Sequence, residues 1–417
     1  MRCASRSSTF ASRRLPEPTA ERLLVECTPW RLVSLALCLA ALPLLACSKK
    51  EPEKTSAPGE EPANPPLVEP APHVAPPQSA AAPKVPRFTS DQPRPLGLGP
   101  VDTELRKRPV REQQAYLKKL IAAYERLDEE ARKALFGIID ASELLSFGNP
   151  EVSRPAQTQK ECDRAWAGLE APQMSEECPR RNMVRVSEEL CVDMFEFPNV
   201  RCEYPVVWVR ASEASAICES LGKRLCDAHE WEGACAGEVR PATEEYDYAR
   251  VPKGEGAEYR RSRRILMEGW HNQARTLVWA YGPQKDHSRC GTGAQKSSGC
   301  DAVSYQRCGT NDYPAGAFPE CRTPTGIFDQ HGNVAEHMNF PLYPEELGGK
   351  GYTEMKGSWF LFAREETHPD DCRWRAKNWH TTKIKDPNSH RNYHLGFRCC
   401  ADMDPSSDQE TPLSKEK

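Results

Sequence analysis

The distribution of apolar residues divides the first part of the chain into three segments. Residues 32–47 carry no charge, and residues 48–100 contain few large apolar side chains. Within residues 101–150 the apolar positions recur at helical spacing, at Leu117, Leu120, Ile121, Tyr124, Leu127, Ala131, Leu135 and Ile138. This spacing predicts one or two short amphipathic helices. We expect them to pack on the domain that follows; the alternative is a helix that dimerises or binds a partner.

The next segment combines patterns of strands and short helices. Cys191–Pro198 alternates apolar and polar residues as a half-buried strand does, and Pro205–Val209 is more uniformly apolar. Ser212 can cap a helix, and Asp227 with Glu230 forms a pair of the capping-box type. The patterns therefore predict two strands followed by two short helices.

The N-terminal residues 1–47 have the features of an export signal. Arginines precede the apolar run, which is too short for a comfortable transmembrane helix and fits the apolar core of a signal peptide. The run ends in Leu44–Cys47, which resembles the lipobox of bacterial lipoproteins, whose cysteine is acylated. We expect Cys47 to anchor the protein in a lipid bilayer; an ordinary signal peptide or an N-terminal anchor helix is the alternative. Ser48 favours the outer membrane, so we expect a lipid-anchored protein of the cell outer membrane or periplasm.

Composition defines the remaining segments. The chain has 417 residues, 37 prolines and a formal charge of −4. Residues 48–100 are rich in Pro, Ala and Glu and predict a disordered linker, and residues 403–417 predict a disordered tail. The mild acidity removes the long-range attraction to phosphate that a nucleic-acid binder needs, so we expect no nucleic-acid partner.

The cysteines predict a cross-linked domain. All but four of the 18 cysteines lie within residues 160–400, and the remaining ones are Cys3, Cys27, Cys38 and Cys47. A dense, even set in an exported chain implies disulfides, up to seven of them. Zinc is the alternative, but no CxxC pair is present. The connectivity stays open, except that the adjacent Cys399 and Cys400 are expected to bond to different partners.

Three ordered blocks resemble one family. Gly222–Cys235 (GKRLCDAHEWEGAC) resembles the segment GKRLPTEAEWEYAC of formylglycine-generating enzymes, also called sulfatase-modifying factors. Gly326–His337 (GIFDQHGNVAEH) resembles GLYDMHGNVWEW, and Lys356–Trp359 with Leu395–Cys399 resembles the ending GGSW … LGFR. The resemblance implies an irregular C-type-lectin-like α+β domain over residues 160–402, rich in loops and suited to many disulfides.

The resemblance also implies a calcium site. In the family, a loop of this kind binds one ion through two side chains and two backbone carbonyls. The matching positions are Asp329, Gly332, Val334 and Glu336. Oxygen ligands on an irregular loop suit this hard cation. The alternative is a solvated turn in which Asn333 hydrogen-bonds locally.

The oxidase site of the family is not matched. Its members hold copper(I) with two cysteines in the pattern GGSxxCxxxxC, and counting from Ser358 places Leu361 and Glu366 at these positions. Neither side chain is a soft ligand, and Cys372 lies too far along the chain. We therefore expect no copper and no conversion of a sulfatase cysteine to formylglycine. A second branch holds iron through His-x3-His-x-Glu on helices, and it is excluded because residues 101–150 contain no His.

Other residues of the domain are candidates for binding. The resemblance places Ser358, Trp359, Arg373 and Arg375 at the floor of a groove in which relatives hold an extended peptide. For Trp359 we expect core packing, and for the two arginines both a binding and a structural role stay open. His380, His390 and His394 also cluster, but we expect surface or hydrogen-bonded histidines there rather than a metal or acid–base site.

These observations predict an envelope lipoprotein that presents a sulfatase-modifying-factor-like domain. We expect the domain to bind a peptide or glycan, or to serve as a scaffold, without copper oxidase activity. Two alternatives stay open: a formylglycine-generating-type oxidoreductase with a rearranged metal site, and a purely structural envelope protein.

Overall fold

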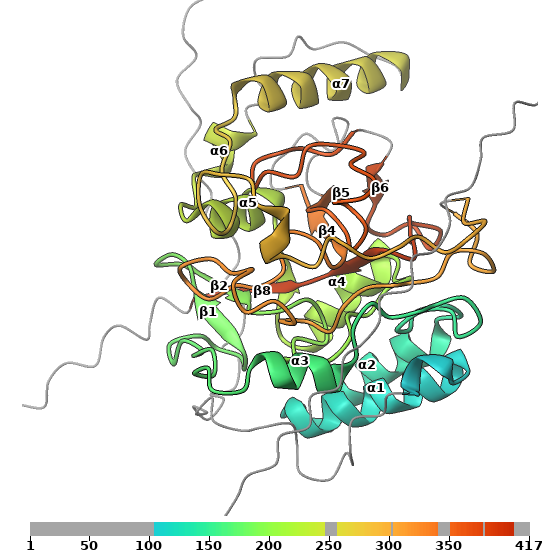
Figure 1. Ribbon diagram of the computed structural model, residues 1–417. Coiled ribbons are helices and arrows are strands. Elements are labelled where there is room, and N and C mark those ends of the chain that lie inside the picture. Colours follow the sequence, from blue (N-terminus) through green and yellow to red (C-terminus); the bar gives the residue numbers. More distant parts are fainter. Residues whose placement is uncertain (1–103, 247–256, 302, 341–350, 378–379, 404–417) are drawn as a thin grey trace, which may run out of the picture. The chain divides into compact units, whose positions relative to one another are not determined.

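The computed structural model describes residues 104–246, 257–301, 303–340, 351–377 and 380–403, which lie within one compact unit, Ala80–Lys417 (Figure 1). The predicted signal peptide with Cys47, the predicted linker and all but the first residue of the predicted tail lie outside these residues. No helix among the described residues is long and apolar enough to cross a membrane.

Two helices form where the helical spacing predicts them. The segment comprises a 3₁₀ turn at Leu105–Lys107, α1 at Val110–Tyr124 and α2 at Glu129–Ala141. Asp128 caps α2, because its side chain accepts a hydrogen bond of 2.8 Å from the Ala131 N–H.

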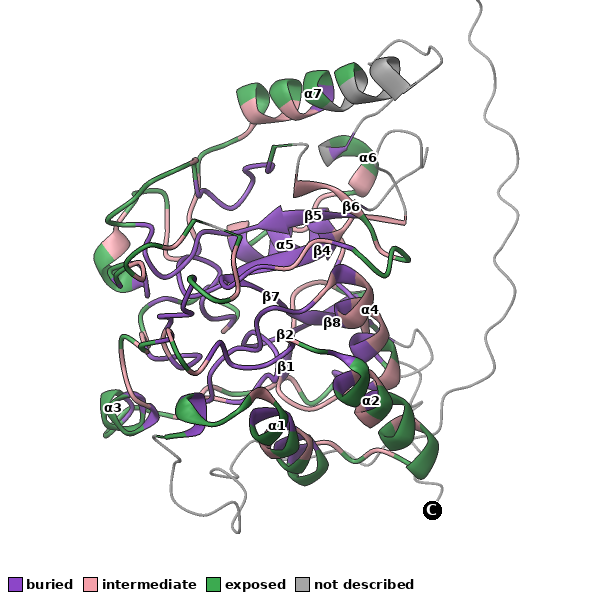
Figure 2. Ribbon diagram, turned by 90° about the vertical axis from the view of Figure 1, so that its right-hand side faces the viewer, coloured by how far each residue is buried: buried purple, intermediate pink, exposed green. Residues whose placement is uncertain are grey.

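The helices pack on the domain as expected. Buried apolar residues of α1 and α2 share one core with residues from the rest of the chain, and their other sides are exposed (Figure 2). This core includes Leu117, Ile121, Leu135, Ile139, Val206, Ile217 and Phe397. The helical segment is therefore an integral part of the folded unit.

Two small sheets form the centre of the domain. The first is fully antiparallel, in the order β1-β2-β8-β3, with β1 at Met183–Arg185, β2 at Leu190–Asp193, β8 at Cys399–Asp402 and β3 at Arg224–Leu225. The second has the order β6-β5-β4-β7, with β6 at Thr382–Lys383, β5 at Tyr352–Lys356, β4 at Ala335–Asn339 and β7 at Leu395–Phe397. Within it, β4 and β7 run parallel.

The first expected strand is shorter than predicted, and the second does not form a strand. In Cys191–Pro198 the strand β2 ends at Asp193. Pro205–Val209 is buried but forms only a single bridge, between Ser146 and Val207. The backbone of this segment changes partner at each step, because Val206 N–H donates to Phe197 and Trp208 N–H donates to Asn392. No ladder can continue along such a segment.

The remaining helices surround the sheets. They are α3 at Gln159–Ala165, α4 at Ala211–Ser220, α5 at Ala228–Ala236, α6 at Ala242–Glu245, α7 at Ala257–Ala274 and a 3₁₀ turn at His287–Arg289. The expected pair at the start of α5 is confirmed, since the Glu230 carboxylate accepts a 2.8 Å hydrogen bond from the Asp227 N–H. The expected cap at Ser212 is wrong. Instead, α4 begins at Ala211, and Glu213 accepts a 2.7 Å bond from the Arg210 N–H.

Seven disulfides cross-link the unit, in agreement with the prediction. They join Cys162–Cys202, Cys178–Cys191, Cys218–Cys399, Cys226–Cys400, Cys235–Cys372, Cys290–Cys321 and Cys300–Cys308. The adjacent Cys399 and Cys400 do bond to different partners, one on α4 and one next to β3. The expected loop-rich, disulfide-stapled α+β class is confirmed.

Candidate functional site

A buried arginine gathers the acidic residues of the predicted calcium loop. Arg398 lies between β7 and β8, and its guanidinium donates two hydrogen bonds, of 2.7 and 2.8 Å, to the Glu336 carboxylate on β4. It also donates to the Phe328 carbonyl at 2.9 Å, and Glu196 and Asp329 act on it electrostatically. All three carboxylates are buried, so one guanidinium faces three acidic groups.

Burial favours protons on these carboxyls. It raises the pKa of Asp329 to about 7, although the Gly316 N–H donates a 2.5 Å bond to Oδ2. Burial also raises the pKa of Glu196 well above its ordinary value, and its two oxygens lie buried without an N–H donor. Either shared protons or an additional cation can satisfy this excess of negative charge.

The backbone of the predicted calcium loop adopts left-handed conformations at three positions. Asp329, Gly332 and Asn333 all have positive φ, of 58°, 76° and 52°. A Cβ at Gly332 would lie 2.6 Å from the Gly291 carbonyl oxygen, so only glycine fits there. The Asn333 side chain accepts a 3.0 Å bond from the Tyr313 N–H, which fixes the loop to a distant segment.

The residues predicted to bind calcium carry hard oxygen donors, but Arg398 competes with the ion for one of them. Asp329 and Glu336 would supply carboxylates, and Gly332 and Val334 would supply carbonyls. Arg398 already occupies both oxygens of Glu336, so the guanidinium and the ion compete for that side chain. Calcium at these four positions stays a prediction.

The positions that match the copper cysteines carry no sulfur. Leu361 is buried in an apolar cluster, and Glu366 is exposed and forms an ion pair with Lys285. Cys372 bonds to Cys235 with an S–S distance of 2.03 Å. Because the fourteen cysteines between residues 160 and 400 form the seven bridges, none of these described residues offers a free thiol.

A buried lysine replaces the first glycine of the family's GGSW block. Lys356 on β5 pairs with Glu232 of α5 and with Glu354 at 2.9 Å, and donates to the Trp374 carbonyl at 2.9 Å. The side chain is fully enclosed. It therefore serves as an ion-paired link between α5 and β5.

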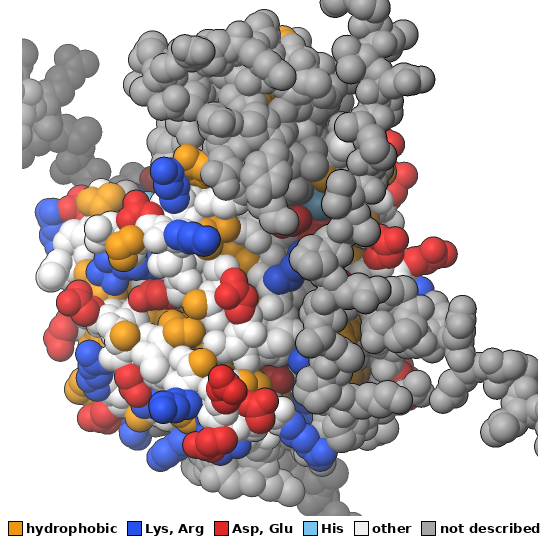
Figure 3. Space-filling view, turned by 180° about the vertical axis from the view of Figure 1, so that it is seen from behind, with side chains coloured by type: hydrophobic (Ala, Val, Ile, Leu, Met, Phe, Trp, Pro, Cys, Tyr) orange, Lys and Arg blue, Asp and Glu red, His pale blue; other side chains and the backbone are white. Residues whose placement is uncertain are grey.

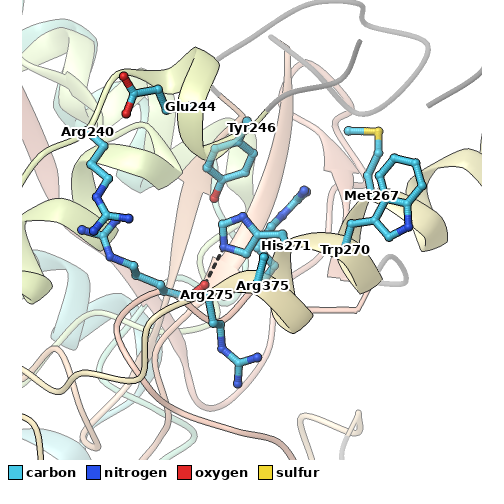
Figure 4. A pocket seen from close by; sticks show the side chains of 10 residues that line it. Arg240, Glu244, Tyr246, Met267, Trp270, His271, Arg275 and Arg375 are labelled. Atoms are coloured by element: carbon cyan, nitrogen blue, oxygen red, sulfur yellow. Dashed lines mark hydrogen bonds between the residues drawn. The ribbon is translucent and has the colours of Figure 1, made fainter. Parts of the chain in front are cut away.

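The four expected groove residues fall into two places. Arg373 and Arg375 line a cavity of about 310 Å³ beside α6 and α7 (Figure 4). Ser358 instead accepts a 2.8 Å bond from the buried Gly332 N–H, and Trp359 is stacked on His394 with a 4.7 Å centroid separation. The interpretation of all four as one groove floor is therefore not supported by the geometry.

The cavity contains residues that the sequence analysis missed. Besides Arg373 and Arg375, its lining includes Arg240, Glu244, Tyr246, Trp270, His271 and Arg275. His271 forms a 2.6 Å hydrogen bond to the Arg373 carbonyl, as drawn in Figure 4. These residues come from α6, α7 and two loops, and no sequence spacing links them.

Two groups of potential metal-binding side chains converge among the described residues. The first contains Cys235, His331 and Cys372, but the two sulfurs are bonded to each other. The second contains His287, Glu366 and Asp370. From the sequence, Glu366 marks only the place of a missing thiol, and the Asp370–Asp371 pair is the local signal for the second group.

The histidines of the C-terminal part act on one another electrostatically. The rings of His380 and His390 lie 6.1 Å apart, and His394 is stacked on Trp359. His337, which replaces the second Trp of the family's WEW, is buried, and its Nε2 lies 3.2 Å from the Val209 carbonyl oxygen. Burial lowers the pKa of His380 to about 4 and that of His337 to about 3, so both are neutral at physiological pH.

The comparisons identify the family of the domain. The family model described as "Sulfatase-modifying factor enzyme 1-like domain" matches residues 187–403, which is more than half of the chain. The protein therefore belongs to this family, and the expected sulfatase-modifying-factor fold of the C-type-lectin-like class is confirmed. No curated protein matches the chain.

Two solved structures are among those similar to it. The Major Tropism Determinant U1 variant has 12% identity and a TM-score of 0.26, and the match covers 54% of this chain and 53% of that one. CarF has 15% identity and a TM-score of 0.27, with 62% and 86% covered. The chain thus spans about half the length of the Major Tropism Determinant.

His337→Gln is expected to reduce the loss of stability on acidification. The fold keeps His337 neutral because its pKa is lowered to about 3, whereas the unfolded chain takes up a proton below a pH of about 6.5. The free energy of unfolding therefore falls as the pH drops below 6.5, by about 2 kcal/mol for one such histidine between pH 7 and pH 5. Urea unfolding at the two pH values measures this difference, and an equal loss in the variant and the native protein would contradict it.

Asp329→Asn is expected to abolish a calcium-dependent rise in melting temperature. Replacing the carboxylate removes a charged ligand and half of the loop's side-chain donors. Calorimetry with calcium chloride and with a chelator measures the shift. Asp163→Asn, an exposed carboxylate on α3, serves as the control that keeps it. A shift that persists in Asp329→Asn would refute the calcium assignment.

Proposed function

We propose that this protein is an envelope-anchored lipoprotein whose sulfatase-modifying-factor-like domain binds a peptide or glycan and does not oxidise cysteine. The observation that carries the proposal is the replacement of both copper-binding positions by Leu361 and Glu366. Copper(I) is a soft ion that needs thiolate ligands, and the cysteines of this part of the chain are bridged. We therefore propose that the side chains of the domain bind a ligand and do not catalyse an oxidation.

The arginine cavity supports a binding role for an anion. Arg275 is held by Asp371 at 2.8 Å, and Arg375 is held by Glu354 at 3.1 Å, so both guanidinium groups have fixed directions. A guanidinium presents its N–H donors in a planar fork that matches anionic groups. Carboxylate and sulfate groups match this geometry through paired hydrogen bonds.

Aromatic residues in the cavity add a flat apolar surface. Arg375 lies 4.6 Å from the ring centroid of Tyr246, and Trp270 on α7 is 42% exposed. The volume of about 310 Å³ lies near the lower end of the range for ligand pockets, so it suits one or two residues of a longer chain. An acidic peptide or an acidic glycan combines these features.

The face seen in Figure 3 carries both signs of charge. Acidic and basic side chains are interspersed over its described surface, so this face presents no single-sign patch to a charged ligand.

Arg240→Ala is expected to weaken binding of acidic probes by about ten- to a hundredfold, because a charge-assisted hydrogen bond contributes roughly 1.5–3 kcal/mol. The probes are tetraglutamate and trigalacturonate, and calorimetric titration of the full chain measures the dissociation constants. Arg307→Ala serves as the matched control, because Arg307 pairs with Asp301 outside the cavity. Uncharged probes of equal length should not bind.

Two outcomes would contradict this proposal. If neither acidic probe binds, or if both variants bind equally, the cavity has no role in recognition and a purely structural protein is favoured. If a cysteine-containing peptide causes copper-dependent oxygen consumption, the oxidase alternative is correct.

Cys47→Ala is expected to move the protein from the membrane to the soluble fraction, because an acyl chain on this residue would supply the bilayer affinity. Fractionation of cells that produce either form measures the distribution. The neighbouring Ser48→Ala substitution is the control and should leave the protein in the membrane. Membrane retention of Cys47→Ala would refute lipidation at this position.

A further inference from the structure

Three potential metal ligands converge next to the position of the missing thiols. His287 belongs to the 3₁₀ turn His287–Arg289, and Glu366 and Asp370 belong to the loop that follows β5. One ligand atom from each lies within 4.8 Å of the others, and His287 Nδ1 is 4.0 Å from Asp370 Oδ2. Their side chains are 22%, 52% and 1% exposed, so the cluster extends from the interior to the surface.

Asp370 is held in place by buried groups. The Trp279 indole N–H donates to Oδ1 at 3.2 Å, and the Ser358 hydroxyl donates to Oδ2 at 3.4 Å. Such fixed partners are typical of a carboxylate that ligates a metal, because they set the direction of its remaining lone pairs.

A buried histidine also points at this carboxylate. His331 Nε2 accepts a 3.0 Å bond from the Ala280 N–H, which places the ring proton on Nδ1. Nδ1 has no hydrogen-bond partner at normal distance and lies 4.0 Å from Asp370 Oδ2, with the side chain only 1% exposed. A buried imidazole beside a carboxylate can serve as the outer partner that many metal sites contain.

We propose that His287, Glu366 and Asp370 bind a divalent metal ion of the zinc or manganese type. One imidazole nitrogen and two carboxylate oxygens suit these borderline and hard ions and do not suit copper(I). Glu366 occupies the position that matches the second copper cysteine, so the donor set has changed from sulfur to nitrogen and oxygen. This proposal is independent of the arginine cavity.

The ammonium group of Lys285 competes with a metal ion for the two carboxylates. It pairs with Glu366 and lies 3.8 Å from Asp370 Oδ1. In the absence of metal it supplies the positive charge that the two carboxylates require. The pair is partly exposed, with 32% and 52% of the two side chains accessible, and an exposed pair contributes only about 0–1 kcal/mol. A divalent ion can therefore displace the ammonium.

To bind one metal ion, the three ligand atoms must move closer together. With bonds of about 2.0–2.2 Å, ligand atoms around a tetrahedral ion lie roughly 3.4 Å apart. The cluster would thus close by about 1 Å, and the exposed Glu366 side chain can supply that movement. His287 Nδ1 and Asp370 Oδ2, now 4.0 Å apart, would also have to approach each other slightly.

The metal would face an open cavity. A space of about 510 Å³ is lined by Lys285, Glu366, Asp370, Trp279 and other residues of the same loop. An ion with three protein ligands keeps at least one position for water or for a ligand group. The cluster therefore provides a metal centre that is accessible from solvent.

The test is calorimetric titration of the full chain, with its disulfides intact and metal removed by chelation, using zinc or manganese chloride alone. One equivalent is expected to bind. Glu366→Gln is expected to raise the dissociation constant about tenfold or more, as is typical for the loss of a metal ligand or its support. The matched control is Glu365→Gln, because Glu365 is the adjacent exposed carboxylate and pairs with Lys296 instead.

A second variant tests the competition directly. Lys285→Met removes the ammonium and is expected to tighten metal binding, with the effect lost when it is combined with Glu366→Gln. The proposal is overturned if no saturable binding occurs, or if Glu366→Gln and Glu365→Gln bind the metal equally. Both substituted glutamates are exposed, so neither outcome depends on a buried residue being replaced.

Discussion

The ion pair between Arg398 and Glu336 holds the domain together at its centre. Arg398 follows β7 of one sheet and precedes β8 of the other, and it also donates to the Asp193 carbonyl at the end of β2. A buried guanidinium of this kind is tolerated only because carboxylates and carbonyls surround it. Arg398 thus joins the two sheets and contacts the predicted calcium loop. The fold and this candidate site therefore depend on the same ion pair.

The described domain presents no soft donor at the positions where the resemblance places the copper ligands. Its cysteines are committed to bridges, and the places where copper ligands would lie carry Leu361 and Glu366. Arginines, carboxylates and the histidines His271 and His368 line the cavities instead. A rigid, cross-linked framework of this type can keep its backbone while the side chains at its surface change, because the disulfides restrict the unfolded chain independently of the site.

The sequence predicted the parts of the structure that depend on local pattern. The helix around Leu117 and the capping pair at Asp227 depend on residues only a few positions apart, so the sequence alone predicts them. The overall fold was predicted from the three blocks that resemble the family. The strand expected at Pro205–Val209 failed because its backbone partners come from distant segments. For the same reason Asp370 and His287, some 80 residues apart, could not be paired from spacing, and the four groove residues separated into two places.

The placement of β8 has a consequence for biosynthesis. This strand comes last in the chain but lies in the middle of its sheet, between β2 and β3, and carries Cys399 and Cys400. Until those residues emerge, β2 and β3 lack the strand that lies between them, and Cys218 and Cys226 have no native partners. The first sheet can therefore be completed only after β8 has been made, and a chain that lacks β8 would expose the edges of β2 and β3 and the thiols of Cys218 and Cys226.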